Sequence, residues 1–315
     1  MSQLKIYFCA DVHGSEIVFA KFLNAGKFYK TDIMMLSGDI TGKMVTPIIR
    51  HKDGSCSSEF MGKKYHLKNE NEVRKLEESI GNGGYYAYLT SEEELKELGD
   101  NKAKAQEIFS SLMTERLKKW IRLAEERLRG MDVKCYMMPG NDDEPMIDKI
   151  LEDSKVVLNP EGKVLEIAGY EMISTGFGNI TPWHCPRDIP EEQLGKKIEE
   201  MASQVKNMKK AIFNFHVPPY SSQLDTAPEI DADLKPVVYR GEMKMIPVGS
   251  TAVRGAIERH QPLLGLHGHI HESRGTFNIG RTLCINPGSE YGEGILRGAF
   301  VGLRNESADY LLTSG

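Results

Sequence analysis

The sequence predicts an α/β fold that is rich in strands, and three stretches near its start carry that prediction. Leu4–Ala10 is a short apolar run without helical spacing, which indicates a buried strand. Glu16–Tyr29 places its apolar residues on one face at helical spacing, and Ile33–Ser37 is a second run of the buried type. A strand, a helix and a strand at this spacing predict a parallel pair of strands joined by a right-handed crossover.

Residues 43–130 interrupt this alternation, and we expect them to form a mainly helical insertion or cap on the core. Pro47–Arg50 is a candidate strand that pairs as a hairpin with Phe60–Leu67. Ala103–Arg129 predicts a long helix, because its apolar residues recur at intervals of three and four positions. The chain is therefore expected to be a single domain, residues 1–315, that carries this inserted segment.

Strands and helices alternate again after the insertion. The predicted strands are Val133–Met138, Val164–Ile167, Glu171–Ser174, Ala211–Phe215, Leu263–Leu266, Leu283–Asn286, Ala299–Leu303 and Tyr310–Leu312. The predicted helices are Glu144–Leu151, Glu191–Met208 and Thr251–His260. No internal repeat or low-complexity tract breaks this pattern.

Composition excludes several classes of protein. Hydrophobic residues make up 40% of the 315 positions and charged residues 27%, so the chain can bury a sizeable core. The net charge is -5 and no basic run occurs, so a nucleic-acid partner is not expected. The five cysteines lie far apart without a CxxC pair, which argues against a disulfide scaffold and a thiolate zinc site. Because no apolar run approaches about 20 residues and Met1–Ala10 is too short for a signal peptide, we expect a cytoplasmic protein without membrane contact.

Seven side chains with metal-binding groups follow the ends of five predicted strands. They are Asp11, His13, Asp39, Asn141, His216, His269 and His271. Ligands of α/β folds bind in the crevice beyond the carboxyl ends of the strands, so we expect these groups to meet in one crevice. Each signal alone is weak, because short polar residues are common turn formers. Their coincidence at five strand ends, in a chain with only nine histidines, is not explained by turns.

The chemistry of these groups predicts the kind of metal. Carboxylates, an amide and imidazoles suit Mn, Fe, Zn, Co or Ni, and they do not suit a structural zinc site. Seven ligands are too many for one small cation, and they suit two ions that share a carboxylate. We therefore expect a centre of two divalent transition-metal ions.

In these blocks the chain resembles the calcineurin-like metallophosphoesterases. The family pattern DxH, GD, GN, H and GHxH is matched in order by Asp11-Val12-His13, Gly38-Asp39, Gly140-Asn141-Asp142, His216 and Gly268-His269-Ile270-His271. The resemblance implies a four-layer sandwich of two mixed β-sheets flanked by helices. By analogy, one metal takes Asp11, His13 and His271, the other takes Asn141, His216 and His269, and Asp39 bridges them.

The activity that the resemblance implies is hydrolysis of a small phosphoester by a metal-bridging hydroxide. Many members of the family carry a histidine after Gly-Asn, where this chain has Asp142. A carboxylate there repels a doubly charged monoester more than a singly charged diester, which favours a phosphodiesterase acting on a diester such as a cyclic nucleotide. Asp142 either acts as a general acid or only tunes the site. The alternatives are a phosphomonoesterase or protein phosphatase on the same centre, and a non-catalytic scaffold of the same fold.

Two histidines outside the metal set are further candidates. His267 shares the alternation of His269 and His271, so it is either a catalytic or ligand-orienting residue or a packed strand histidine. His184 lies in a loop that follows a strand, and it is a candidate for contact with the substrate.

Two arginines are candidates for binding a substrate phosphate or carboxylate, since a guanidinium group offers a bidentate fork. Arg274 is preferred because it lies three residues beyond His271, and Arg254 is the second candidate. The loop Val217–Val238 follows His216 and is long enough to form a lid. The sequence leaves the oligomeric state open.

Overall fold

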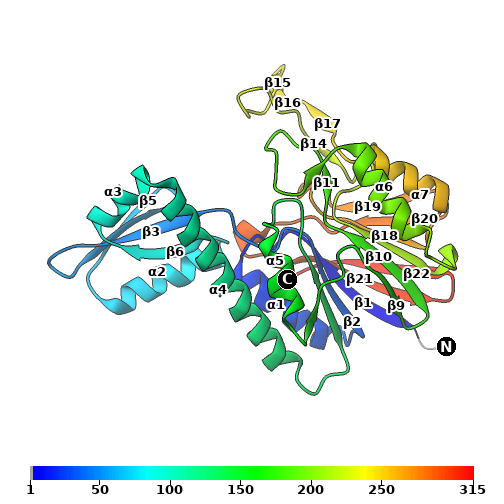
Figure 1. Ribbon diagram of the computed structural model, residues 1–315, viewed down its shortest axis with the longest axis horizontal. Helices are drawn as coiled ribbons and strands as arrows, with labels where there is room; N and C mark the ends of the chain where they lie inside the picture. Colours follow the sequence, from blue (N-terminus) through cyan, green and yellow to red (C-terminus); the bar gives the residue numbers. More distant parts are fainter. Residues whose placement is uncertain (1–2) are drawn as a thin grey trace.

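The computed structural model describes residues 3–315 and is built around two six-stranded sheets (Figure 1). The first sheet has the strand order β22-β21-β1-β2-β7-β8. Its strands are β1 (Leu4–Cys9), β2 (Ile33–Ser37), β7 (Lys134–Met138), β8 (Val157–Leu158), β21 (Arg297–Arg304) and β22 (Ser307–Ser314). The strands β1, β2, β7 and β8 are parallel to one another, whereas β21 pairs antiparallel with both β1 and β22, so the sheet is mixed.

The second sheet is also mixed and has the order β19-β20-β18-β13-β10-β9. Its strands are β9 (Val164–Ile167), β10 (Tyr170–Thr175), β13 (Ala211–Phe215), β18 (Leu264–Leu266), β19 (Gly275–Ile279) and β20 (Thr282–Asn286). The four central strands are parallel, whereas the edge strands β9 and β19 are antiparallel to their neighbours.

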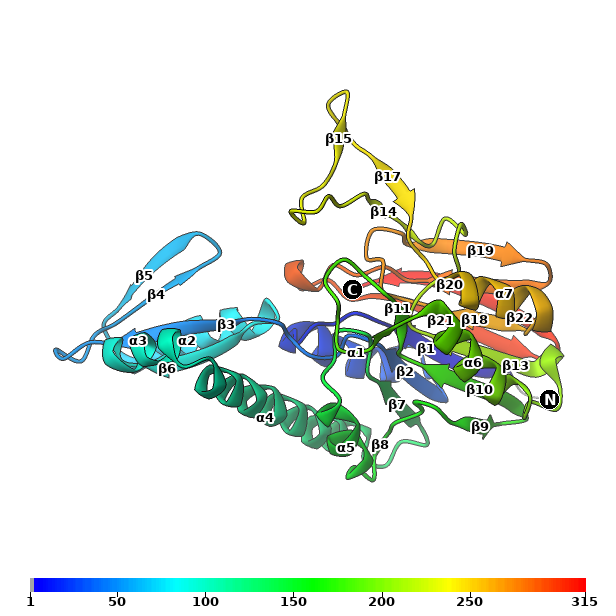
Figure 2. The ribbon, with the colours of Figure 1, turned by 45° about the horizontal axis from the view of Figure 1, so that its top comes forward.

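Side-chain alternation along β1 shows how the layers stack. Ile6 and Phe8 pack with residues of the second sheet such as Ile212, whereas Tyr7 and Cys9 belong to the core under the helices. Helices α1 (Glu16–Phe28), α4 (Lys102–Leu128) and α5 (Met146–Glu152) contribute to that core, and α6 (Glu191–Ala202) and α7 (Thr251–His260) pack on the second sheet. The result is helices, sheet, sheet and helices (Figure 2), so the predicted four-layer α/β sandwich is confirmed.

The segment between β2 and β7 builds a smaller unit at one end of the molecule (Figure 1). It has a four-stranded sheet of order β5-β4-β3-β6 and a small core of its own that includes Ile48, Leu76 and Ile80. The strands are β3 (Val45–Arg50), β4 (Cys56–Phe60), β5 (Lys63–Leu67) and β6 (Tyr86–Thr90), and the helices besides α4 are α2 (Glu70–Asn82) and α3 (Glu92–Asp100). Helices account for more of its residues than strands do.

The strand pairing expected in this unit was wrong. Phe60–Leu67 does not pair with Pro47–Arg50, because β5 pairs with β4 and β3 lies between β4 and β6. The sequence of β4 is Cys-Ser-Ser-Glu-Phe, and only alternate side chains of it are buried. It therefore contains no continuous apolar run, and no local pattern marks it as a strand.

The remaining strands are short. β11 (Gly178–Asn179) pairs with β12 (Asp188–Ile189), and the loop that was expected to form a lid runs into a projecting arm (Figure 2). The arm contains β14 (Thr226–Pro228), β15 (Val238–Tyr239), β16 (Glu242–Met243) and β17 (Met245–Pro247). The helix expected over Glu191–Met208 ends at Ala202, before the 3₁₀ turn Met208–Lys210, and a second 3₁₀ turn is Tyr291–Glu293. Across residues 3–315, none of the helices has an apolar stretch long enough to cross a membrane.

Candidate metal centre

The seven predicted ligands lie in loops that follow β1, β2 and β7 of one sheet and β13 and β18 of the other. Four of them, Asp11, His13, Asp39 and His269, adopt positive φ angles between 40° and 67°. Such backbone conformations cost energy and persist only where surrounding contacts hold them. Here the loops hold one another, because the Asp11 amide donates to Gly38 O and the His13 amide donates to Asp39 O.

Close packing between these loops requires glycine at Gly38. Its φ is +97°, and a Cβ at this position would lie 1.8 Å from Nδ1 of His216. The glycine of the Gly-Asp block therefore lets the β2 loop approach the histidine that follows β13. This contact brings ligands from the two sheets together.

Six of the seven predicted ligands form two groups, each with its ligand atoms within 4.8 Å of one another. The first group is Asp11, His13 and His271, and the second is Asp39, His216 and His269. Asp39 connects them, since its Oδ2 lies 3.6 Å from Nε2 of His13 and its Oδ1 lies 3.4 Å from Nε2 of His216. One carboxylate thus faces both groups, as a bridging ligand does.

Asn141 completes the set with an oxygen that has no protein partner. Its Nδ2 donates to Oδ1 of Asp188 at 2.9 Å, and its Oδ1 is buried without a hydrogen bond. Nε2 of His216 is likewise buried without a hydrogen bond. Buried polar atoms are nearly always satisfied, so these two atoms fit the role of metal ligands.

The electrostatics of the groups also favour cations. Burial opposes charge on Asp39, but His216 and His13 hold the pKa of its carboxyl well below its usual range. Burial lowers the pKa of His13 to about 3, and it lowers the pKa of His269, beside His216, to about 4. Burial also lowers the pKa of His216, but the carboxylates of Asp39 and Asp11 outweigh it and raise that pKa to about 9. Ionised carboxylates beside the neutral imidazoles of His13 and His269 are in the protonation states that a divalent metal ion requires. The pKa values of His216 and His271 are raised, so a metal ion must displace a proton from each of these two rings.

Asp142 reaches the edge of the centre. Its carboxylate forms a third group with His13 and Asp39, accepts a hydrogen bond from Sγ of Cys185 at 2.8 Å and forms an ion pair with Lys43. Burial and the charge of Asp39 raise the pKa of Asp142. The side chain of Lys43 is 52% exposed, so its ammonium group lies at the mouth of the centre.

Sequence reasoning missed the residues that hold the ligand loops in place. Asp143 is buried and accepts hydrogen bonds from the amides of Ile40, Thr41 and Gly140 at 2.8 to 2.9 Å, which ties the loop of Asp39 to that of Asn141. Asp188 holds Asn141 and also accepts from the amide of Thr181. Neither carboxylate belongs to a recognisable sequence motif, because each accepts hydrogen bonds from loops that lie near it only in the folded chain.

Lys43 and Tyr291 were also missed. Lys43 follows Gly38-Asp39 closely but is only one of many lysines in the sequence. The ring of Tyr291 lies 4.6 Å from that of His13 and 5.9 Å from that of His271, centroid to centroid. It packs against two candidate ligands at once.

The structure does not bring His267 into the metal groups. Its side chain is fully buried beside β18, and Nδ1 lies 2.9 Å from the backbone oxygen of Phe215. Burial lowers its pKa to about 4. This position matches the packed-histidine interpretation, because the ring bonds to the neighbouring strand, and the catalytic or ligand-orienting role of His267 stays a prediction.

The other three candidates are placed differently from one another. His184 is exposed in the loop that carries Cys185. Arg254 lies on α7 and pairs with Glu258 at 2.5 Å, so its fork is already occupied. Arg274 lines a cavity of about 290 Å³ that also has His271 in its wall.

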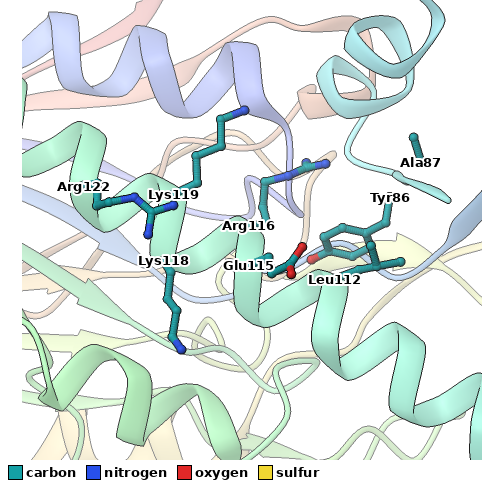
Figure 3. A pocket seen from close by; sticks show the side chains of 8 residues that line it. All are labelled: Tyr86, Ala87, Leu112, Glu115, Arg116, Lys118, Lys119 and Arg122. Atoms are coloured by element: carbon teal, nitrogen blue, oxygen red, sulfur yellow. The ribbon is translucent and has the colours of Figure 1, made fainter. Parts of the chain in front are cut away.

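A larger cavity of about 430 Å³ lies along α4 and contains none of the predicted ligands in its wall (Figure 3). Arg116, its central residue, already pairs with Glu16 at 3.0 Å and donates to Gly14 O at 2.6 Å. Lys118 and Lys119 point away from each other in Figure 3. The basic side chains therefore do not converge on one point.

Comparisons with known proteins support the fold. No protein-family model matches the chain. An uncharacterized protein, MJ1162, of Methanocaldococcus jannaschii is 33% identical over 160 residues, which cover 50% of this chain and 64% of that protein. The chain thus matches less than two thirds of the length of this relative.

Two solved structures match nearly the whole chain. One crystal structure is 17% identical with a TM-score of 0.59 and covers 98% of this chain and 99% of its own. The protein TT1561 of Thermus thermophilus is 14% identical with a TM-score of 0.55 and covers 99% of both chains. At these identities the likeness shows the α/β sandwich fold alone.

Proposed function

We propose that this chain hydrolyses small phosphoesters, preferably diesters, at a centre of two divalent metal ions. The observation that carries the proposal is the position of Asp39, whose two carboxylate oxygens face the two separate groups of histidine and aspartate ligands. Two divalent ions bound there supply an activated water and a positive site for phosphate oxygens. Mn, Fe, Zn, Co and Ni all suit these oxygen and nitrogen ligands.

The side chains around the groups have defined tasks in this proposal. Asp188 holds the amide nitrogen of Asn141, which leaves the Asn141 oxygen free to bind the second ion. Asp142 and Lys43 lie where the substrate enters, and Asp142 takes the place of the histidine that many calcineurin-like metallophosphoesterases carry. A carboxylate at this position disfavours a second negative charge on the substrate, which supports a diester.

One observation favours a second candidate, a phosphomonoesterase or protein phosphatase. Lys43 pairs with Asp142 and offsets the negative charge on which the preference for diesters depends. The preference then depends on whether Lys43 stays on Asp142 or turns to the substrate. A Lys43→Met variant separates the two candidates, because it leaves the charge of Asp142 unopposed and should lower turnover of monoesters more than that of diesters.

The test of the function is turnover of bis-(p-nitrophenyl) phosphate and p-nitrophenyl phosphate by Mn²⁺-loaded protein. We expect activity on the diester that Asp39→Asn and His216→Ala each reduce by about 100-fold or more. The matched controls are Asp309→Asn and His66→Ala, which change the same residue types at exposed positions and should retain activity. Wild-type turnover no faster than that of Asp39→Asn would refute the proposal.

Metal analysis separates an enzyme from a non-catalytic scaffold of the same fold. We expect about two metal ions per chain after expression in metal-replete medium, from the two groups of ligands. A protein that binds no metal under these conditions would be a scaffold.

A further inference from the structure

A cavity of about 290 Å³ adjoins one side of the candidate metal centre. Its wall is formed by His271, Glu272, Arg274, Gly288, Ser289, Glu290 and Arg297. His271 belongs to both sites, since its Nε2 lies 3.6 Å from Oδ1 of Asp11 and the residue also lines the cavity. A phosphoester held at the metal groups would therefore lie next to this cavity.

The wall is tied to the ligand loops by hydrogen bonds. Oγ of Ser289 donates to the backbone oxygen of Asp11 at 2.6 Å, and the Ser289 amide donates to His271 O at 3.2 Å. Gly288 has a φ of +70°, and a Cβ there would lie 2.8 Å from His271 O and 2.9 Å from Cβ of Arg274. The wall of the cavity is thus anchored to the loops that carry Asp11 and His271.

The charges on the wall are balanced. Arg297 pairs with Glu290 at 2.7 Å, and Glu272 and Arg274 add one charge of each sign. An anionic substituent would gain no net attraction from this set, because the two glutamates offset the two arginines. An apolar substituent would leave these charged groups without partners.

Hydrogen-bonding capacity remains open on this wall. Arg274 is exposed and donates only a long bond of 3.4 Å to Thr313 O, so most of its N–H donors are free. Glu272 and Glu290 are exposed and offer carboxylate acceptors. A ligand that both donates to carboxylates and accepts from guanidinium groups matches these requirements, and adjacent hydroxyl groups do both.

We propose that the His271–Arg297 cavity binds the vicinal hydroxyl groups of a sugar or polyol substituent of the phosphoester. This inference rests on the proposed phosphoesterase function and names the class of its substrate. Glu272 accepts from the hydroxyl groups, and Arg274 donates to them. The cavity selects among diesters that present the same phosphate and the same leaving group.

The test uses two pairs of diesters that differ only in hydroxyl groups. The first pair is 2,3-dihydroxypropyl and propyl p-nitrophenyl phosphate, and the second is the 5′-(p-nitrophenyl phosphate) of uridine and of 2′,3′-dideoxyuridine. We expect kcat/KM to be about tenfold higher or more for a hydroxylated member, the gain of one or two good hydrogen bonds. The first pair reports a polyol and the second a sugar ring.

Two variants test whether the preference for hydroxylated diesters arises in this cavity. Glu272→Gln and Arg274→Gln should each bring the ratio of the two kcat/KM values towards one. Arg259→Gln is the matched control, because it removes an arginine of α7 that pairs with Glu199 and lines neither the cavity nor the metal groups, and it should keep the wild-type ratio. Ratios near one for both pairs in the wild-type protein would refute the cavity proposal while leaving the phosphoesterase function in place.

A binding measurement keeps the inference testable if no diester is turned over, a result that would refute the proposed function. Calorimetry on Mn²⁺-loaded protein compares 2,3-dihydroxypropyl phosphate with propyl phosphate, and ribose 5-phosphate with its 2,3-dideoxy analogue. Tighter binding of a hydroxylated member, lost in Glu272→Gln, supports the cavity as a hydroxyl site. Equal affinities within both pairs would overturn it.

Discussion

Single residues in this protein act mainly by holding other residues. Asn141 offers a free oxygen to the candidate centre only because its amide nitrogen is bound to Asp188. The carboxylate of Asp188 also accepts from Thr181 and Cys185, so it connects a metal-ligand loop with the loop that contacts Asp142. Residues that orient ligands in this way control metal affinity without touching the metal.

Asp188→Asn is expected to lower Mn²⁺ affinity by about 10- to 100-fold. The replacement puts an amide where Asn141 and two backbone amides donate, so the oxygen of Asn141 loses its fixed orientation. Equilibrium dialysis measures the change. Asp153→Asn, at an exposed position after α5, is the control and should bind as the wild type does, and an unchanged affinity in Asp188→Asn would contradict the role given to Asp188.

The buried side chain of His267 should make the stability of the folded chain depend on pH. Burial lowers its pKa from an ordinary 6.5 to about 4, because it outweighs the hydrogen bonds to the backbone of Phe215 and Val217 that favour the protonated ring. The unfolded chain therefore binds the proton more readily between these values, so stability is complete above pH 6.5 and is lost as the pH falls towards 4. The loss attributable to His267 is about 3 kcal/mol.

Urea unfolding of chelator-treated protein between pH 4 and 7 measures this slope. His267→Asn, which keeps a donor for the Phe215 carbonyl, should show a shallower decline than the wild type. The remaining slope is expected from His13 and His269, whose pKa values are also lowered by burial. Identical slopes in the two proteins would show that His267 does not titrate in this range.

At the scale of elements, α4 connects the inserted unit with the core. Trp120 of α4 is buried and stacks on Phe19 of α1, with centroids 4.1 Å apart and an interplanar angle of 3°. Arg116 of the same helix donates to the backbone of Gly14, next to His13, and to that of Tyr85. The helix therefore contacts both the loop that carries two candidate ligands and the inserted sheet.

Trp120→Ala should lower the free energy of unfolding by about 3 to 5 kcal/mol, because it leaves a cavity between α4 and α1. Urea denaturation followed by circular dichroism measures the loss. Arg122→Ala, at an exposed position of the same helix, should change stability by no more than about 0.5 kcal/mol. A loss below about 1 kcal/mol in Trp120→Ala would mean that the stacked pair does not hold the helix.

At the scale of the whole molecule, the two sheets meet at a cluster of buried charges. Asp11, Asp39 and His216 are each no more than 2% exposed, and no lysine or arginine side chain of residues 3–315 pairs with either aspartate. Without metal, the protonated ring of His216 lies near both carboxylates, and bound metal ions would supply more positive charge to the two aspartates than this one proton does. Metal ions that bind only the folded chain should therefore stabilise it as a whole.

Removal of metal by a chelator is expected to lower Tm by about 5 to 10 °C. This shift corresponds to the loss of about 4 kcal/mol of binding free energy, which saturating metal adds to the stability of the folded chain. Readdition of Mn²⁺ should restore the transition, and Mg²⁺ is the comparison for an ion that prefers oxygen ligands. In Asp39→Asn the chelator should have a much smaller effect, since the ligand that faces both groups has lost its charge. A wild-type Tm that does not respond to chelator or metal would argue against a metal centre.

The sequence by itself determined the α/β class, the parallel pair of strands β1 and β2, and the identity of the candidate ligands. These features are local: buried strands are continuous apolar runs, and each ligand stands in the loop that follows one, as Asp11 does after β1 and His216 after β13. The inserted sheet was less predictable, because β4 buries only one of its faces and carries no such run. A strand that is buried on both faces is easier to predict from the sequence than a strand that is buried on one face, because only the first has a continuous apolar run.

Only the tertiary structure decided which side chains act together. The pairing of Lys43 with Asp142, the support of Asn141 by Asp188 and the cavity between His271 and Arg297 all join residues that lie far apart in the sequence. His267 and His269 differ by two positions, yet the first bonds to a neighbouring strand and the second joins a group of candidate ligands. Loop conformation beyond the last strand residue sets that difference, and it depends on contacts such as the one at Gly38 that no local pattern encodes.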